Sequence, residues 1–108
     1  HFGEAAGSWG PHQDASSLRK IKRLVEYERP DLVVLSGDQL TGGGIWENAT
    51  VYWDAIVDAL GGTPHTAILG NHDAAPWHGD ESSPGAKTNR TELMLHDISK
   101  SSSFSKLG

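Results

Sequence analysis

The first part of the chain carries an amphipathic pattern that predicts a helix ending at Pro30. Apolar side chains recur there at spacings of three and four residues, which places them on one helical face. The predicted apolar face consists of Leu18, Ile21, Leu24 and Val25. The candidate N-caps that precede it are Asp14, Ser16 and Ser17. The basic residues lie largely off the apolar face, and we expect them in solvent: Arg19, Lys20, Lys22 and Arg23.

Two short apolar runs predict strands, and each ends in small and polar residues. Residues 31–38 read Asp-Leu-Val-Val-Leu-Ser-Gly-Asp. Four consecutive branched apolar residues suit a strand that is buried on both faces, as in a parallel sheet covered by helices. Thr66–Leu69 forms the second run, and Gly70 ends it.

Further helices are expected between the strands and after them. Glu47–Leu60 is amphipathic, and the glycine pair after it is typical of a C-cap. The residues expected to face the sheet are Val51, Ala55, Ile56, Ala59 and Leu60, and those expected to pack nearby are Trp46, Tyr52 and Trp53. A shorter helix from about Asn89 to Ser99 would bury Leu93, Met94 and Ile98.

The order of elements, helix, strand, helix, strand, predicts an α/β fold with parallel strands and a right-handed crossover. The glycine-rich stretch 1–14 is expected to be irregular, residues 74–108 to be rich in loops, and residues 99–108 to hold no clear element. The chain opens on His1 without a signal-peptide pattern. We therefore expect residues 1–108 to be part of one domain, truncated at both ends.

Composition narrows the classes of function. A net charge of -5 argues against a general nucleic-acid or anionic-membrane surface, and no apolar run is long enough to cross a membrane. The chain has no cysteine, so any metal must be held by oxygen and nitrogen ligands. The triplets at Asn48 and Asn89 fit the N-glycosylation pattern and favour a secretory or extracellular location, although two such triplets can also arise by chance.

Polar side chains come directly after both predicted strands. Asp38 ends the first run, and Asn71, His72 and Asp73 end the second. Gly-Asn-x-Asp is also turn chemistry, in which Asn and Asp cap a loop. If the strands are neighbours, however, the two groups lie side by side where open α/β sheets bind ligands. A bridging carboxylate there could hold two cations about 3.5–4 Å apart.

These blocks resemble a known family. Leu-Ser-Gly-Asp (35–38) and Leu-Gly-Asn-His-Asp (69–73) are similar to the second and third signature blocks of the calcineurin-like metallophosphoesterases. His1-Phe2-Gly3-Glu4 resembles the continuation of the first block after its Asp-x, and residues 30–41 are most similar to the fungal and plant purple-acid-phosphatase-like branch. The resemblance spans residues 1 to about 75. It implies the N-terminal part of an αββα sandwich.

The resemblance also implies a binuclear metal centre that hydrolyses phosphate esters with a metal-activated hydroxide. His1 would bind the first metal, Asp38 would bridge, and Asn71 would bind the second. His72 would lie near the phosphoryl group, where it would stabilise charge or protonate the leaving oxygen, and Asp73 would orient His72. The two ions would be manganese, iron or zinc.

The chain departs from the family pattern in several places. The Asp that would precede His1 and the later histidine ligands have no match, so the fragment itself is expected to be inactive. Thr41 stands where purple acid phosphatases proper carry a metal-binding tyrosine, so a tyrosinate–iron site is not supported. The other histidines are expected on the surface or in loops, with His78 as a candidate substrate contact; they are His12, His65, His78 and His96.

Two other functions fit parts of the sequence. A non-catalytic member of the family could use the same fold as a protein-binding scaffold, but a scaffold has no need to keep all four residues Asp38 and Asn71–Asp73. An N-terminal His1 could also chelate copper through its amine and imidazole, as in oxidative polysaccharide enzymes. Those enzymes are β-sandwiches, and this chain alternates helices with strands.

Overall fold

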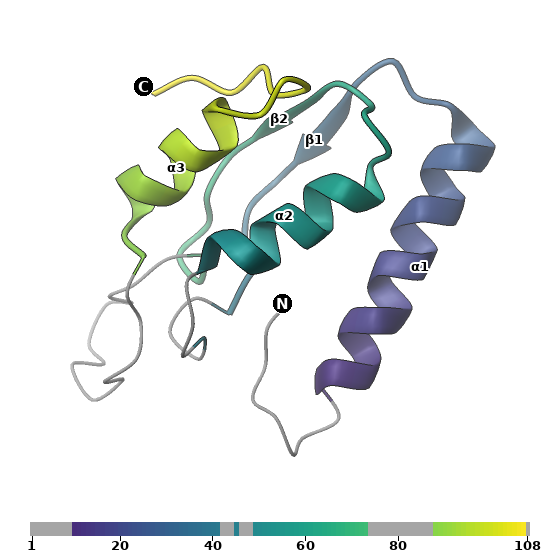
Figure 1. Cartoon of the computed structure of the whole chain (residues 1–108), viewed down its shortest axis with the longest axis horizontal. Coiled ribbons are helices and arrows are strands. Elements are labelled where there is room, and N and C mark those ends of the chain that lie inside the picture. The colour runs from purple at the N-terminus through teal and green to yellow at the C-terminus, as the bar shows by residue number, and fades with distance from the viewer. Residues whose placement is uncertain (1–9, 42–44, 46–48, 74–87, 108) are drawn as a thin grey trace.

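The structure is a computed structural model, and it describes residues 10–41, 45, 49–73 and 88–107. The elements are arranged in the order α1 (Gly10–Glu28), β1 (Val33–Leu35), α2 (Ala49–Ala59), β2 (His65–Ala67) and α3 (Arg90–Ile98) (Figure 1). The predicted order of helix, strand, helix, strand is therefore confirmed, and so is the shorter helix near residue 90. Among the described helices, none combines the length and apolar character needed to cross a membrane.

Helix α1 begins earlier than the sequence pattern predicts. Its first residue is Gly10, so the expectation of irregular structure is wrong for residues 10–14, while residues 1–9 lie outside the described ranges. Pro11 is tolerated because the first amides of a helix have no partner within the helix. At the other end Arg29 has φ 47 and donates its amide to Val25 O at 2.9 Å, which closes the helix before Pro30.

More of the surface of α1 is exposed to solvent than the sequence pattern predicts. The four basic residues expected in solvent are exposed, as predicted. Leu24, however, is 60% exposed, although the pattern placed it on the buried face. Leu18 packs against the core, so the apolar stripe of α1 meets the rest of the molecule over only part of its length.

The two strands pair in parallel, as predicted. Val33 is opposite His65, and Leu35 is opposite Ala67. The sheet also gains a neighbour that the sequence did not indicate, because Ser103 forms a parallel bridge with His65. The His65 amide donates to Ser102 O at 2.9 Å, and the Phe104 amide donates to His65 O at 2.7 Å. The C-terminal segment thus extends the sheet beyond β2.

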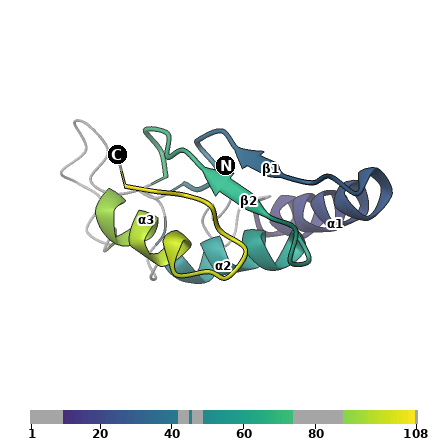
Figure 2. The same cartoon turned by 90° about the horizontal axis from the view of Figure 1, so that it is seen from above.

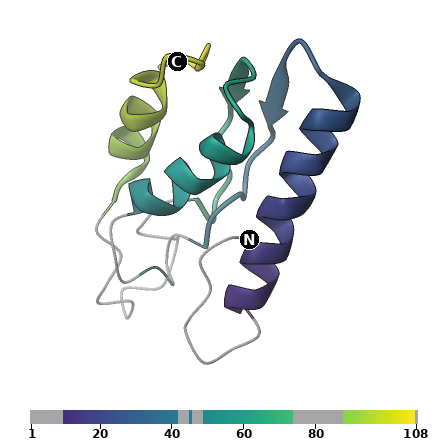
Figure 3. The same ribbon diagram turned by 45° about the vertical axis from the view of Figure 1, so that its right-hand side comes forward.

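Helices cover one face of this sheet. Figure 2 shows α1, α2 and α3 on the same side of the strands, and Figure 3 shows α2 between the other two helices, both of which it contacts. Leu35 and Ala67 face this layer, where Trp53 of α2 and Leu93 of α3 are completely buried. The core forms between the sheet and these helices because strand and helix each present one apolar face.

The opposite face of the sheet carries apolar side chains that nothing among the described residues covers. Val34 is 56% exposed and Ile68 is 63% exposed. The prediction that residues 32–35 are buried on both faces is therefore wrong for this structure. The second sheet of the predicted αββα sandwich does not occur among the described residues, so it stays a prediction.

Helices α2 and α3 confirm most of their predicted contacts. Ile56 and Leu60 are buried as expected, whereas Val51 is 58% exposed. Helix α3 begins with a capping box, in which the Asn89 side chain accepts from the Glu92 amide at 2.9 Å and the Glu92 carboxylate accepts from the Asn89 amide at 3.0 Å. This reciprocal pair fixes where α3 begins.

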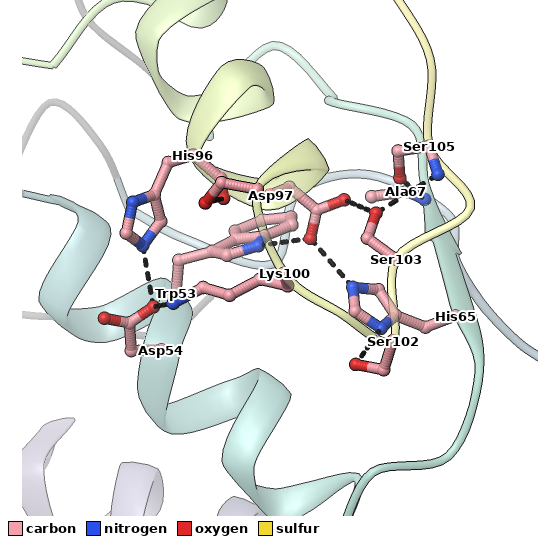
Figure 4. A network of polar contacts seen from close by, with 11 residues as sticks. Trp53, Asp54, His65, Ala67, His96, Asp97, Lys100, Ser102, Ser103 and Ser105 are labelled. Atoms are coloured by element: carbon pink, nitrogen blue, oxygen red, sulfur yellow. Dashed lines mark hydrogen bonds and ion pairs between the residues drawn. The ribbon is translucent and has the colours of Figure 1, made fainter.

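A buried polar network joins α2, β2, α3 and the C-terminal segment (Figure 4). The Asp97 carboxylate accepts from Trp53 Nε1 at 2.8 Å and from Ser103 Oγ at 2.8 Å, and its Oδ1 lies 2.8 Å from His65 Nε2. His65 and Asp97 have no solvent exposure, so the prediction that His65 is a surface or loop residue is wrong. Burial raises the pKa of Asp97, but hydrogen bonds, among them those from His65 and Trp53, lower it by more, to below its ordinary value of 3.8.

A second, more exposed cluster joins α2 to α3. His96 Nε2 lies 2.7 Å from Asp54 Oδ1, and Lys100 Nζ pairs with the same oxygen. His96 is thus half-buried rather than free on the surface. Burial raises the pKa of Asp54, whereas its bonds to Lys100 and His96 lower it by more.

We predict that Asp97→Ala lowers the free energy of unfolding by about 3 kcal/mol, because it leaves buried donors without their acceptor. Asp58→Ala, at an exposed position of α2, is the matched control and should change little. Because folding depresses the pKa of Asp97, its contribution is present above about pH 3.8 and is lost as the pH falls through the folded pKa. Urea unfolding at several pH values measures both effects, and equal losses in the two variants would contradict this role.

Candidate functional site

The two polar groups predicted from the sequence meet at one edge of the sheet. Because β1 and β2 are parallel neighbours, their carboxyl ends point the same way (Figure 1). The pairing continues past β2, where the Ile68 amide donates to Leu35 O at 2.9 Å. The turn after β1 therefore lies beside the turn after β2. This confirms that Asp38 and residues 71–73 are close in space.

Asp73 joins these two turns through its side chain. Its Oδ2 accepts from the amides of Asp38 and Gly70, each at 2.7 Å, and its Oδ1 accepts from the Leu40 amide at 2.7 Å. The residue is completely buried. Hydrogen bonds to a carboxylate are stronger than those to neutral acceptors. Two of these donors come from the turn after β1, so Asp73 holds that turn against its own.

Asp38 makes the return connection. Its Oδ1 accepts from the backbone amide of His72 at 2.9 Å. The backbone at Asp38 has φ 54, in the left-handed region that non-glycine residues seldom adopt. Such backbone strain concentrates at functional sites, where the surroundings hold it. Here the bond from the Asp38 amide to Asp73 is part of that hold.

The two turns approach so closely that each needs a glycine. A Cβ on Gly70 would lie 2.1 Å from Asp38 Oδ1 and 2.5 Å from the Asp38 nitrogen. A Cβ on Gly37 would lie 3.0 Å from the Gly70 nitrogen, and Gly37 also has φ 100. The glycines of both sequence blocks are thus explained by the distance between the turns.

The remaining predicted site residues differ in their surroundings. Asn71 is exposed and His72 is half-buried at the edge of the site. The Asp73 carboxylate accepts from the backbone amides of Asp38, Leu40 and Gly70, and its predicted action on the His72 ring stays a prediction. His1 and His78 lie outside the described residues.

The donor atoms of the site suit a hard cation. Asp38 supplies a carboxylate and Asn71 an amide oxygen, the ligand types that Mg²⁺, Mn²⁺ and similar ions prefer. In the part of the chain that the structure describes, no three His, Asp or Glu side chains gather as a ligand group. Asp38 and Asn71 therefore fit part of a metal centre. Together they do not make a full ligand set, so further ligands would be needed.

Sequence reasoning missed Arg90, the first residue of α3. Its Nη1 donates to Gly70 O, and its Nη2 donates to Leu69 O at 2.7 Å. It lies outside the recognised sequence blocks. A basic residue in the first turn of a helix is electrostatically unfavourable. Because Arg90 directly follows the Asn89 cap, its position is the sequence signal that could have indicated an acceptor elsewhere in the fold.

We predict that Asp73→Ala lowers the free energy of unfolding by about 3 kcal/mol or more, because three backbone donors lose one shared acceptor. Asn71→Ala, in the same turn but exposed, should change it by less than about 0.5 kcal/mol. Chemical denaturation of both variants measures the difference. If the two variants are equally stable, Asp73 does not hold the turns together.

Comparison with known proteins gives a family for the chain. Residues 1–106 match the family model of the calcineurin-like phosphoesterases. Over 61 residues the chain is 39% identical to "Probable inactive purple acid phosphatase 28" of Arabidopsis thaliana; the match covers 56% of this chain but 15% of that protein. No solved structure gives a significant match. Because the family model covers far more than half of the residues, the chain belongs to the calcineurin-like phosphoesterase family.

Proposed function

We propose that the protein hydrolyses phosphate esters at a centre of two metal ions built on the adjoining ends of β1 and β2. Membership of a phosphoesterase family supports the reaction class. The observation that carries the proposal is the double connection between the turns, in which Asp73 binds the Asp38 amide and Asp38 binds the His72 amide. This connection brings a carboxylate, an amide oxygen and an imidazole to one edge of the sheet.

In this proposal Asp38 would bridge the two ions, and Asn71 would bind the second. His1, which lies outside the described residues, would bind the first. Within the described residues Oδ1 of Asp38 already accepts from His72, which leaves Oδ2 for a cation. When bound, paired cations neutralise charge on phosphoryl oxygens and make hydroxide available near neutral pH. The ligand types are compatible with manganese, iron or zinc.

His72 is the proposed proton donor and charge stabiliser. Its backbone is held by Asp38 Oδ1, and the next residue, Asp73, is anchored by three bonds, so the point from which the ring projects is fixed. A positioned imidazolium can protonate a leaving oxygen or stabilise negative charge on the phosphoryl group. The proposed substrate is therefore a phosphate ester. The proposed reaction requires neither a nucleic acid nor a membrane as a partner.

A second candidate function comes from the comparison with the Arabidopsis protein, whose name describes it as probably inactive. In that case the fold would serve as a scaffold without catalysis. Against this, the chain keeps Asp38, Asn71 and His72, and the structure holds their turns together. A scaffold does not need the strained backbone that Asp38 adopts.

We predict that the natural full-length protein, supplied with Mn²⁺, hydrolyses an aryl phosphate monoester or diester. Asp38→Asn and His72→Ala should each lower kcat/KM by about 10²–10⁴-fold, the range typical of groups that act in proton transfer or charge stabilisation. Asp31→Asn is the matched control, because Asp31 is exposed at the opposite end of β1.

Steady-state rates with both ester types decide between the candidates. Activity that survives both substitutions would contradict the proposed mechanism. A folded wild-type protein that binds Mn²⁺ but hydrolyses neither ester would favour the scaffold.

A further inference from the structure

We propose that Arg90 is a positioning residue for the turn that carries Asn71, and that it sets the affinity for the cation bound there. This inference rests on the proposed function, since it concerns the same site. Arg90 is the first residue of α3 and is separated in sequence from both polar blocks. Its guanidinium reaches two consecutive carbonyls, Leu69 O and Gly70 O, immediately before Asn71.

Gly70 is bonded to a charged side chain on each side of its backbone. Its amide donates to Asp73 Oδ2 at 2.7 Å, and its carbonyl accepts from Arg90 Nη1. The carbonyl of Gly70 belongs to the same planar peptide unit as the amide of Asn71. Fixing this carbonyl therefore fixes the direction in which the chain enters Asn71.

Because residue 70 is a glycine, its backbone must be restrained by contacts with other residues. The space around Gly70 excludes a Cβ because Asp38 lies against it. A glycine, however, has more backbone freedom than any other residue, so the turn cannot hold its own shape by local sterics. Asp73 fixes one side of Gly70, and Arg90 fixes the other.

Arg90 can act as a hold because its helix is itself anchored. The capping box between Asn89 and Glu92 fixes the start of α3, and Leu93 is completely buried in the core. The planar guanidinium offers two parallel donors, which suits two neighbouring carbonyls in a way that a lysine ammonium does not. The Arg90 side chain thus connects an anchored helix to the turn that carries Asn71, the predicted metal ligand.

Charge and position make opposite predictions about Arg90. A positive charge beside a cation site repels the cation, so removing the charge should tighten metal binding if charge were the main effect. A positional hold predicts the reverse, because a ligand that is free to move binds a metal more weakly. This opposition makes the proposal testable with two substitutions.

The test is a Mn²⁺ titration of the natural full-length protein by calorimetry. Arg90→Lys keeps the charge but loses the paired donors, and Arg90→Gln loses the charge. We expect both to weaken the second, Asn71-dependent binding step about tenfold, as for other residues that orient metal ligands. Lys106→Gln is the matched control, because Lys106 lines the same surface pocket as Arg90 and its change removes one nearby charge. Wild-type affinity in Arg90→Lys, with tighter binding in Arg90→Gln, would overturn the proposal.

Amide hydrogen exchange in the metal-free protein separates this inference from the proposed function. The amides of Gly70 and His72 are hydrogen-bonded to Asp73 and Asp38, and both should exchange faster in the two Arg90 variants. Unchanged exchange would show that Arg90 does not hold the turn. If the wild type binds no Mn²⁺ at all, the proposed function fails, and the exchange rates still decide whether Arg90 fixes the turn.

Discussion

The arrangement of the site depends on one buried carboxylate, that of Asp73. Parallel pairing brings the ends of β1 and β2 to the same edge, but it does not by itself fix the turns beyond them. Asp73 supplies that constraint by accepting three backbone amides, two of them from the neighbouring turn. A buried carboxylate is stable only when its oxygens accept hydrogen bonds. Asp73 therefore needs the amides of the two turns, and the turns need Asp73 as their shared acceptor. The strained backbone of Asp38 donates one of these bonds, and Gly37 and Gly70 approach closely between the same two turns.

A second buried carboxylate fixes the opposite end of β2. Asp97 bonds His65, where β2 begins, and it also bonds Trp53 of α2 and Ser103 of the C-terminal segment. An acidic side chain therefore anchors the start of β2, and a second one, Asp73, anchors the turn that follows its end. Arg90 adds a basic side chain from α3 to the site end. The helical layer and the sheet thus determine the geometry of the turns together.

The sequence was sufficient for the order of elements and for the meeting of the two polar blocks, because both depend on local periodicity and on a simple rule of parallel sheets. It did not reveal the pairs that depend on tertiary packing. His65 and Asp97 are 32 positions apart, and no local pattern marks a buried histidine. Leu24 and Val51 fit an apolar face on a helical projection, yet the width of that face depends on which neighbours are present. Asp73 was recognised as a site residue, but its backbone partners could be found only in three dimensions.

We propose that the turns joined by Asp73 form a site for two cations. Anomalous diffraction from crystals of the natural full-length protein grown with Mn²⁺ would locate these ions. We expect two anomalous peaks about 3.5–4 Å apart, with the Asp38 carboxylate between them and the Asn71 side-chain oxygen beside one. Crystals with Mn²⁺ bound elsewhere, or with no peak beside Asp38 at saturating metal, would contradict the proposed two-cation site.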